Sequence, residues 1–191
     1  VDRARRLLGI DTVDLYLLSY LGRISRFSPA IQDTLVKLRE SGAVRAVGTS
    51  THNRKYAGEL ARDSILDALM IRYNAAHPGA EQDIFPHLEA RKPLIISYTT
   101  TSWRELLKPI KGIEMPPYPG EESAPPLTPE LCYRFVLQSP HVHVALTGPK
   151  TVAQLEQNMK SVEQGPLSPE VDEWVRQYGR EVHKRKKLPF M

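Results

Sequence analysis

Two kinds of hydrophobic pattern alternate along the chain. Short apolar runs bounded by Gly, Ser, Thr or Asn are typical of buried parallel strands. Apolar residues spaced three and four positions apart indicate amphipathic helices. The predicted strands are residues 13–18, a run that begins at Val44, and residues 68–73, 94–98 and 142–147. The predicted helices are residues 1–8, Pro29 to Gly42, 55–62, 81–90, 129–138, 151–162 and 169–183.

This regular alternation predicts parallel βα units, either in a doubly wound open sheet or in a barrel. No G-x-G-x-x-G sequence follows the first strand and no Walker-type lysine loop occurs, so the common nucleotide-binding open sheets lack support. We therefore favour an α/β fold of the TIM (β/α)8 barrel class, as a single domain over residues 1–191. Since such barrels have eight strands, the five predicted here indicate an incomplete barrel.

The run VRAVGTSTHN, from Val44 to Asn53, is the most informative part of the sequence. It places small polar residues directly after a buried strand. Ligands bind at the carboxyl ends of parallel strands, where loops converge and helices present free N–H groups. We expect Gly48 to Asn53 to line a site, although Ser50 alone could instead cap the following helix.

Composition, charge and cysteine count narrow the class of protein to which this chain can belong. The chain of 191 residues is 41% hydrophobic and 25% charged, with a net charge of +4, which is ordinary for a globular protein. Its single cysteine, Cys132, excludes internal disulfides and suits a reducing compartment, so we expect a cytoplasmic protein. No signal peptide or membrane span is visible. The basic tail, residues 183–191, contains HKRKK and predicts a solvated end rather than a nucleic-acid site.

Proline interrupts the pattern once, because six prolines lie between Pro116 and Pro129. Neither a helix nor a central strand can form there. The Pro-rich loop, residues 111–129, is either a surface loop over a site or a linker.

Few other side chains indicate chemistry. The spacing of His52, His77 and His87 is irregular, and no carboxylate accompanies them in a ligand pattern, so we expect no metal site. His52 and His77 follow strand ends, and one of them could contact a substrate. Cys132 lies on an amphipathic helix and indicates core packing. Trp103 follows a strand and could line a substrate pocket or simply pack.

Several segments together resemble the aldo-keto reductases, which are TIM barrels that reduce carbonyls with a nicotinamide cofactor. Similarity to the C-terminal part of that family, strands four to eight of its barrel, covers nearly the whole chain. The segments that carry it are LGIDTVDLYLL, ESGAVRAVGTSTHN, IRYN, LIISYT and TGPKTVAQLEQN, in the family's order. The resemblance implies that the chain is the later, truncated part of a longer reductase.

The resemblance also implies roles for single residues. Ser50 and Thr51 would contact the nicotinamide carboxamide, Tyr98 would stack on its ring, and Thr99 would adjoin it. Met70 stands where the family often has glutamine, and a thioether donates no hydrogen bond. Residues that would hold the adenosine-phosphate end are Gly148, Lys150, Gln154 and Asn158. Ser19 occupies the position of the family's catalytic histidine, and Tyr20, His52 and Trp103 would line the substrate site.

The resemblance implies carbonyl reduction by hydride transfer from NADPH in the complete protein, with NAD as the other possible cofactor. The family's aspartate, tyrosine and lysine come from earlier strands, so we expect this chain alone to be inactive. The expected partner is a small-molecule carbonyl substrate. The alternative is a non-catalytic module that binds a nicotinamide cofactor or regulates another protein.

Overall fold

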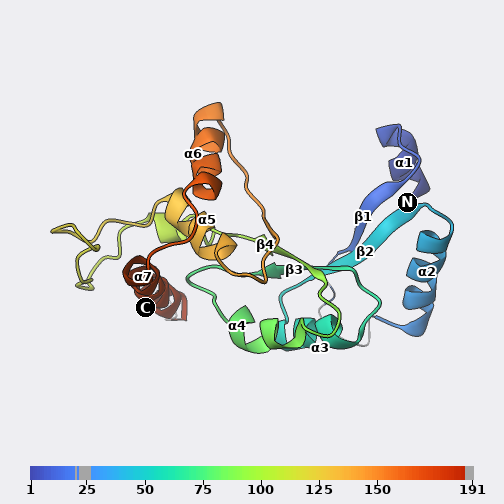
Figure 1. Ribbon diagram of the computed structural model, residues 1–191, viewed down its shortest axis with the longest axis horizontal. Helices are drawn as coiled ribbons and strands as arrows, with labels where there is room; N and C mark the ends of the chain where they lie inside the picture. The colour runs from blue at the N-terminus through green and yellow to red at the C-terminus, as the bar shows by residue number, and fades with distance from the viewer. Residues whose placement is uncertain (20, 22–26, 188–191) are drawn as a thin grey trace. The chain divides into compact units, whose positions relative to one another are not determined.

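The computed structural model describes residues 1–19, 21 and 27–187. Five strands form one sheet in the order β1-β2-β3-β4-β5, which is also their order along the chain. They are β1 (Val13–Leu18), β2 (Val44–Thr51), β3 (Ala68–Arg72), β4 (Leu94–Tyr98) and β5 (Val144–Ala145). β1 and β2 are parallel, as are β2 and β3. Helices separate successive strands, so the α/β fold with parallel βα units is confirmed (Figure 1).

Contacts between residues group the chain into two compact units. Unit 1 comprises Val1–Ile71 and Gly79–Ile96, and unit 2 comprises Arg72–Pro78 and Ser97–Met191. Each unit is described by itself below. The single domain over residues 1–191 stays a prediction.

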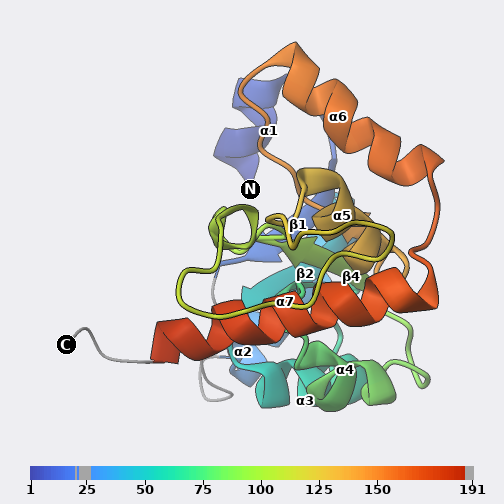
Figure 2. The same cartoon turned by 90° about the vertical axis from the view of Figure 1, so that its left-hand side faces the viewer.

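Unit 1 contains α1 (Asp2–Leu8), α2 (Pro29–Glu40), α3 (Arg54–Asp63) and the short α4 (Ala80–Asp83). Gly9 ends α1 in the left-handed conformation, with φ of 65°. Ser28 caps α2 and Pro29 follows at its first position, as the sequence predicts. Figure 2 shows α3 beside α4, where Gly58 lies against the backbone of Asp83 with no room for a Cβ.

Asp67 joins the strands of unit 1 just before β3. Its amide donates to the Val47 carbonyl at 2.7 Å, and its Oδ2 accepts from the Val47 amide at 2.9 Å. The Asp67 carbonyl accepts from the Leu94 amide at 2.8 Å. These bonds set the start of β3 against β2 and β4. One face of β2 is well covered, because Val47 and Thr49, two residues apart and therefore on the same side of the strand, are fully buried.

Unit 2 contains α5 (Pro129–Leu137), α6 (Val152–Glu163) and α7 (Pro169–Lys187). Thr128 and Thr151 cap the first two of these helices. The core of the unit includes Tyr73 and Phe135, whose rings stack with centroids 5.7 Å apart. α7 lies so close to the segment after β3 that a Cβ on Gly179 would clash with the Ala75 carbonyl.

The Pro-rich loop packs on α7. Trp174 Nε1 donates to the Pro116 carbonyl at 2.9 Å, and the Tyr118 ring meets Trp174 edge-on with centroids 5.1 Å apart. At the start of the loop, the Tyr178 hydroxyl donates to the Lys108 carbonyl at 2.7 Å. The segment has no helix or strand within residues 111–128, as its prolines predict. Because it is anchored to a helix of its own unit, the linker interpretation is wrong.

Three predicted elements differ from the structure. The helix predicted over residues 81–90 is only α4 followed by a 3-10 turn at Phe85–His87, because Pro86 cannot continue an α-helix. The strand predicted over residues 142–147 shortens to β5, which has a neighbour on one side only in the sheet order. The final helix runs past His183 to Lys187, so the first part of the basic tail is helical rather than a free end. The rest of the tail, residues 188–191, lies outside the described part.

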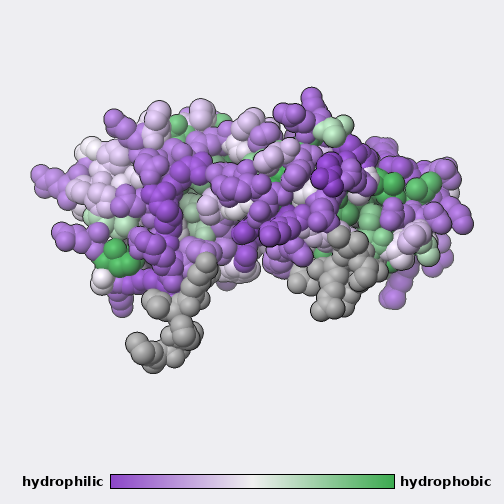
Figure 3. Space-filling model, turned by 90° about the horizontal axis from the view of Figure 1, so that it is seen from below, coloured by the Kyte–Doolittle hydropathy of each residue, from purple (hydrophilic) through white to green (hydrophobic). Residues whose placement is uncertain are grey.

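The surface is largely hydrophilic on the face drawn in Figure 3, where apolar residues form only small groups. Among the described residues, no helix is long and apolar enough to span a membrane.

Candidate functional site

Unit 1 places Ser19 and Ser50 at neighbouring strand ends. The register of β1 and β2 pairs Leu18 with Thr49, and Ser19 and Ser50 are the next residues on the two chains. The Ser50 carbonyl also accepts a 3.0 Å hydrogen bond from the Leu21 amide. Ser19 is exposed and Ser50 half-buried. Both lie at the carboxyl ends of neighbouring parallel strands, and their roles toward a ligand stay predictions. Tyr20, predicted to line the substrate site, lies outside the described residues.

The loop after β2 begins helix α3. Thr51 is buried, and its Oγ1 accepts from the Asn53 amide at 3.1 Å. Asn53 Oδ1 accepts from the Tyr56 amide at 3.1 Å and so caps the helix. The alternative that Ser50 is the cap is therefore wrong. His52, between them, is exposed, and its substrate contact stays a prediction.

Ser50 lies opposite Met70 in the register of β2 and β3. Both side chains are half-buried. The Met70 thioether can accept only weakly and cannot donate. Of these two side chains, only the hydroxyl of Ser50 can donate a hydrogen bond.

Unit 2 holds the other predicted cofactor residues, beginning with Tyr98 and Thr99 at the end of β4. Tyr98 is half-buried, and Thr99 turns the chain with φ of 56°. The Thr99 hydroxyl donates to the Tyr98 carbonyl at 2.7 Å, and Asn74 Nδ2 donates to the Thr99 carbonyl at 2.8 Å. Asn74 is fully buried, so it holds the turn after Tyr98 in place.

Trp103 is 54% exposed. The guanidinium carbon of Arg72 lies 5.9 Å from its ring centre, within range for a cation–π contact. This exposure is not that of a core side chain, and a packing role on the surface stays the alternative. Its role in lining the substrate site stays a prediction.

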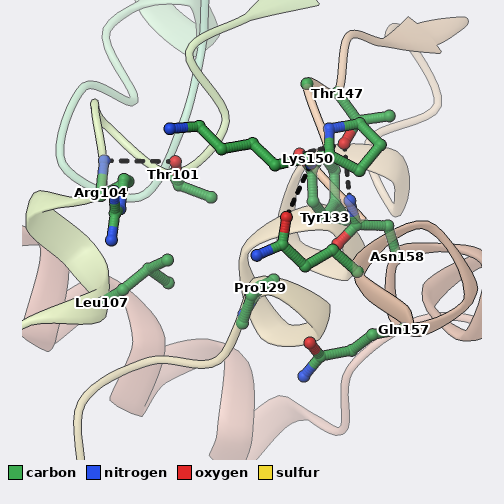
Figure 4. A pocket seen from close by; sticks show the side chains of 12 residues that line it. Thr101, Arg104, Leu107, Pro129, Tyr133, Thr147, Lys150, Gln157 and Asn158 are labelled. Carbon is green, nitrogen blue, oxygen red and sulfur yellow. Dashed lines mark hydrogen bonds between the residues drawn. The ribbon is translucent and has the colours of Figure 1, made fainter. Parts of the chain in front are cut away.

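A pocket of about 400 Å³ in unit 2 brings together all four residues predicted to hold the adenosine-phosphate end. Gly148 and Lys150 come from the loop after β5, and Gln154 and Asn158 from α6 (Figure 4). Loop residues after β4 and the start of α5 complete its wall. The four residues predicted to hold the adenosine-phosphate end therefore line one cavity. The ligand that this cavity would hold remains a prediction.

Hydrogen bonds organise one wall of this pocket around Thr147. Its Oγ1 accepts from the Tyr133 hydroxyl at 2.8 Å and from Asn158 Nδ2 at 2.6 Å. Burial raises the pKa of Tyr133, an effect that the bond to Thr147 partly offsets. The phenol therefore stays protonated at neutral pH and acts as a donor. Helices α5 and α6 are thereby joined through one threonine.

At the start of α6, side chains of the same segment accept hydrogen bonds from backbone N–H groups. Thr151 Oγ1 accepts from the Gln154 amide at 3.2 Å, and Gln154 Oε1 accepts from the Lys150 amide at 2.7 Å. The cap therefore satisfies the Gln154 amide, one of the N–H groups at the start of the helix. The Gln154 Oε1 atom holds the loop at Lys150 through this hydrogen bond. The Gln154 Nε2 amide can still donate to a ligand.

Sequence reasoning missed five polar residues of the pocket: Thr101, Arg104, Tyr133, Thr147 and Gln157. Thr101 and Arg104 lie a few residues after β4, so the rule that ligands bind after strand ends could have indicated them. Tyr133 gave no such signal, because its apolar neighbours on α5 indicate only a core face. The pocket wall contains Arg104 and Lys150 but neither aspartate nor glutamate, so its charge favours an anion.

The structure also bears on two other candidate chemistries, a metal site and a cysteine nucleophile. In the part of the chain that the structure describes, no three His, Cys, Asp or Glu side chains come together as a metal site would require. Cys132 is 1% exposed, and burial raises the pKa of its thiol to about 12. A thiolate nucleophile is thus disfavoured, and core packing of Cys132 is confirmed.

Comparisons with known proteins were made at the level of sequence and of structure. No family model matches this chain, and no curated protein matches it. Several solved structures do match this chain. An aldo-keto reductase from Bacillus halodurans, AKR11C1, is 20% identical with a TM-score of 0.73 over 93% of this chain and 65% of its own. The thermostable aldo-keto reductase Tm1743 is 19% identical, with a TM-score of 0.66 over 93% and 64%.

A third neighbour is an aldo/keto reductase from Klebsiella pneumoniae, whose structure is described as a complex with NADP and acetate. It is 19% identical, with a TM-score of 0.69 over 93% of this chain and 63% of its own. The chain thus spans slightly less than two thirds of the length of these neighbours. The resemblance seen in the sequence is confirmed at the level of fold: the α/β fold of this chain is similar to part of the barrel of these aldo-keto reductases.

Proposed function

We propose that this chain binds NADP(H) and that, within a complete barrel, it belongs to an aldo-keto reductase that reduces a small carbonyl compound. The observation that carries the proposal is the pocket of unit 2. It combines Gly148, Lys150, Gln154 and Asn158, the four residues that the resemblance assigns to the adenosine-phosphate end, in one cavity. The fold shared with aldo-keto reductases, one of them described with NADP, supports the same proposal.

The residues of the pocket fit an adenosine phosphate chemically. Lys150 and Arg104 supply positive charge, while Asn158 and Gln154 supply amides. Gly148 has open space where a Cβ would lie, so a ligand can approach its backbone closely. A phosphate ester gains from cations and amide donors of this kind.

In the proposed mechanism, a nicotinamide cofactor would provide hydride-transfer chemistry when bound, and residues of this chain would position it and the carbonyl compound. Tyr98 would present one face of the ring, and Ser50 would hold its carboxamide. Ser19, exposed at the end of β1, would orient the carbonyl oxygen by donating a hydrogen bond. Serine is not a general acid at neutral pH, so we propose that the proton comes from the part of the barrel outside this chain.

A non-catalytic cofactor-binding module is the second candidate. Two observations favour it: Ser19 offers a hydroxyl where the family has histidine, and Met70 faces Ser50 with a thioether. Such a module would bind NADPH through the same pocket but would show no turnover even when the rest of the barrel is supplied.

Titration of the purified chain with NADPH, followed by nucleotide fluorescence, tests the cofactor proposal. We expect saturable binding that weakens about tenfold or more in Lys150→Met, because a charge-assisted bond to phosphate is lost. Lys92→Met, an exposed lysine of unit 1, is the matched control and should bind as the unchanged chain does. A folded chain that shows no saturable binding would refute the proposal.

Turnover separates the two candidates. The chain alone should not oxidise NADPH in the presence of carbonyl compounds, because its proton donor would be absent. Turnover after addition of the missing strands would support the reductase, and continued inactivity despite tight NADPH binding would favour the module.

A further inference from the structure

A second cavity, of about 250 Å³, lies in unit 1 and is lined by residues of α2 and α3. Gln32 belongs to α2, and Tyr56, Glu59 and Leu60 belong to α3. Because these α3 residues are spaced three and four positions apart, they share one face of the helix. The cavity has no residue in common with the pocket of unit 2 and is independent of the cofactor proposed there.

The Tyr56 hydroxyl is the one group of this cavity wall that is buried without a partner. Tyr56 is only 4% exposed, and its hydroxyl has no hydrogen-bond partner among the described residues. Leaving a buried polar group unpaired costs free energy, so most such groups in folded proteins have a partner. Burial, and to a smaller extent the charge of Glu59, raises the pKa of Tyr56, so the phenol stays protonated at neutral pH. A ligand in the cavity would supply the missing partner.

The charged groups of the cavity leave one carboxylate uncompensated. Two carboxylates, of Glu59 and Asp63, and one guanidinium, of Arg62, line it, so its net charge is −1. Arg62 Nε pairs with Asp63 Oδ2 at 2.5 Å. In the part of the chain that the structure describes, no ion pair engages the carboxylate of Glu59, which is exposed. The cavity therefore favours a cation over an anion.

The neutral groups of the cavity fit the same kind of ligand. Gln32 Nε2 donates to the Phe27 carbonyl at 3.0 Å, which leaves Gln32 Oε1 as an acceptor. The Tyr56 oxygen is a second acceptor, and the Glu59 carboxylate is a third. Phe27 and Leu60 are buried apolar residues of the wall. The cavity thus combines three acceptors and one net negative charge with apolar surface.

A primary ammonium on a short alkyl chain matches this combination. It carries three N–H donors and one positive charge, equal in number to the acceptors and to the uncompensated charge. A neutral ligand that only accepts hydrogen bonds would pair with the Tyr56 hydroxyl but would leave Glu59 without a counter-charge. The volume is below the roughly 300–1,000 Å³ of pockets for drug-sized ligands, so only a small group fits.

We propose that this cavity of unit 1 binds a primary alkylammonium group, with its charge at Glu59 and its alkyl chain against Phe27 and Leu60. Tyr56 and Gln32 accept the remaining hydrogen bonds of the ammonium. Both small aliphatic amines and the lysine side chains of other proteins carry this group. The two sources present the same ammonium to the cavity and differ only in what lies outside it.

An NMR titration of the full, 15N-labelled chain with n-butylammonium chloride tests the proposal. We expect saturable shifts of the backbone amides of Gln32, Tyr56 and Glu59, with a Kd of about 1–10 mM, as suits a ligand of a few heavy atoms. n-Butanol has the same chain length without the charge. It should bind at least about fivefold more weakly, because it makes no charge-assisted hydrogen bond.

Two variants separate the charge from the phenol. Glu59→Gln should weaken butylammonium binding about fivefold or more and leave butanol binding unchanged. Tyr56→Phe should weaken butylammonium binding about threefold. Without ligand, its melting temperature should equal or exceed that of the unchanged chain, because the unpaired buried hydroxyl is gone. Glu40→Gln, at an exposed acid of α2 outside the cavity, is the matched control and should bind butylammonium as the unchanged chain does.

Weaker binding in Glu59→Gln and Tyr56→Phe, with unchanged binding in Glu40→Gln, supports the proposal. Equal affinities for butanol and butylammonium overturn the assignment to an ammonium, and a folded chain without saturable shifts overturns the site. Unchanged binding in both cavity variants also overturns it. Nα-acetyl-lysine amide distinguishes the sources: tighter binding than butylammonium supports a lysine side chain of a partner protein, and weaker binding supports a free amine.

Discussion

The Tyr133 hydroxyl donates a 2.8 Å hydrogen bond to Thr147 Oγ1, and through it helix α5 is joined to the loop that begins at the end of β5. The same oxygen accepts from Asn158 on α6. Thr147 therefore links α5 and α6 by accepting a hydrogen bond from each at this wall of the pocket. Thr147 is itself exposed.

We expect Thr147→Val to lower the free energy of unfolding by about 1–3 kcal/mol, because it leaves the donors of Tyr133 and Asn158 without their acceptor. Tyr133→Phe removes one donor only and should cost about 1 kcal/mol. Urea denaturation measures both. Thr34→Val, an exposed threonine of α2, should change stability by less than about 0.5 kcal/mol. Equal losses in all three variants would show that the Thr147 bonds do not stabilise the unit.

Gly48 allows β2 to pass closely between its neighbours. A Cβ there would lie 2.5 Å from the Ala68 carbonyl oxygen and 2.7 Å from Leu17 Cδ2. Gly48→Ala should therefore reduce stability by about 2 kcal/mol or more, since β1 and β3 must move apart. Gly148→Ala meets open space and should leave the melting temperature nearly unchanged. Similar melting temperatures for the two variants would contradict the close approach.

The raised pKa of the Tyr178 phenol predicts that the folded state loses stability at alkaline pH. Burial, with a contribution from Cys132, raises the pKa of Tyr178 from 10.0 to about 12. Because the folded pKa is higher, stability is complete below pH 10 and is lost as pH rises from 10 toward 12. The loss should be on the order of 2 kcal/mol. Denaturant titrations between pH 9 and 12 measure it.

Tyr178→Phe should flatten that part of the pH profile, because phenylalanine does not ionise. It should also be less stable below pH 10, since the bond to the Lys108 carbonyl is absent. An unchanged slope in Tyr178→Phe would assign the alkaline transition to other groups.

Helix α6 exposes an apolar face, formed by four residues that are 42–72% exposed: Val152, Leu155, Met159 and Val162. Exposed apolar groups of this kind promote association. We expect Met159→Gln combined with Val162→Gln to reduce dye binding by the chain and its self-association in light scattering, with little change in melting temperature. Glu156→Gln on the same helix is the control. Unchanged association in the double variant would exclude this face as its cause.

Local signals in the sequence predict most of the elements correctly. Ser28-Pro29 sets the start of α2, Gly9 ends α1, and the apolar runs give β1 and β4 with their exact bounds. These signals depend on residues within one turn or one strand, so they can be recognised without knowledge of the fold. The four residues after β5 that meet in one pocket came instead from the resemblance to the aldo-keto reductases.

Other features depend on partners far away in sequence. The length of β5 and the continuation of α7 past His183 follow from neighbours such as Ser97, whose carbonyl accepts from Leu146, and His77, whose ring meets His183. Arg104 follows the end of β4 by a few residues, but only the tertiary structure shows that it lines the same pocket as Lys150.

The sequence by itself thus determined the alternation of strands and helices, the resemblance to the aldo-keto reductases and the candidate residues, because periodicity, caps and motifs are local. Only the tertiary structure decided which polar groups share a pocket, which glycines permit close packing and where Arg104 and Tyr133 lie. Those properties arise from contacts between distant segments, which a pattern along one chain does not contain.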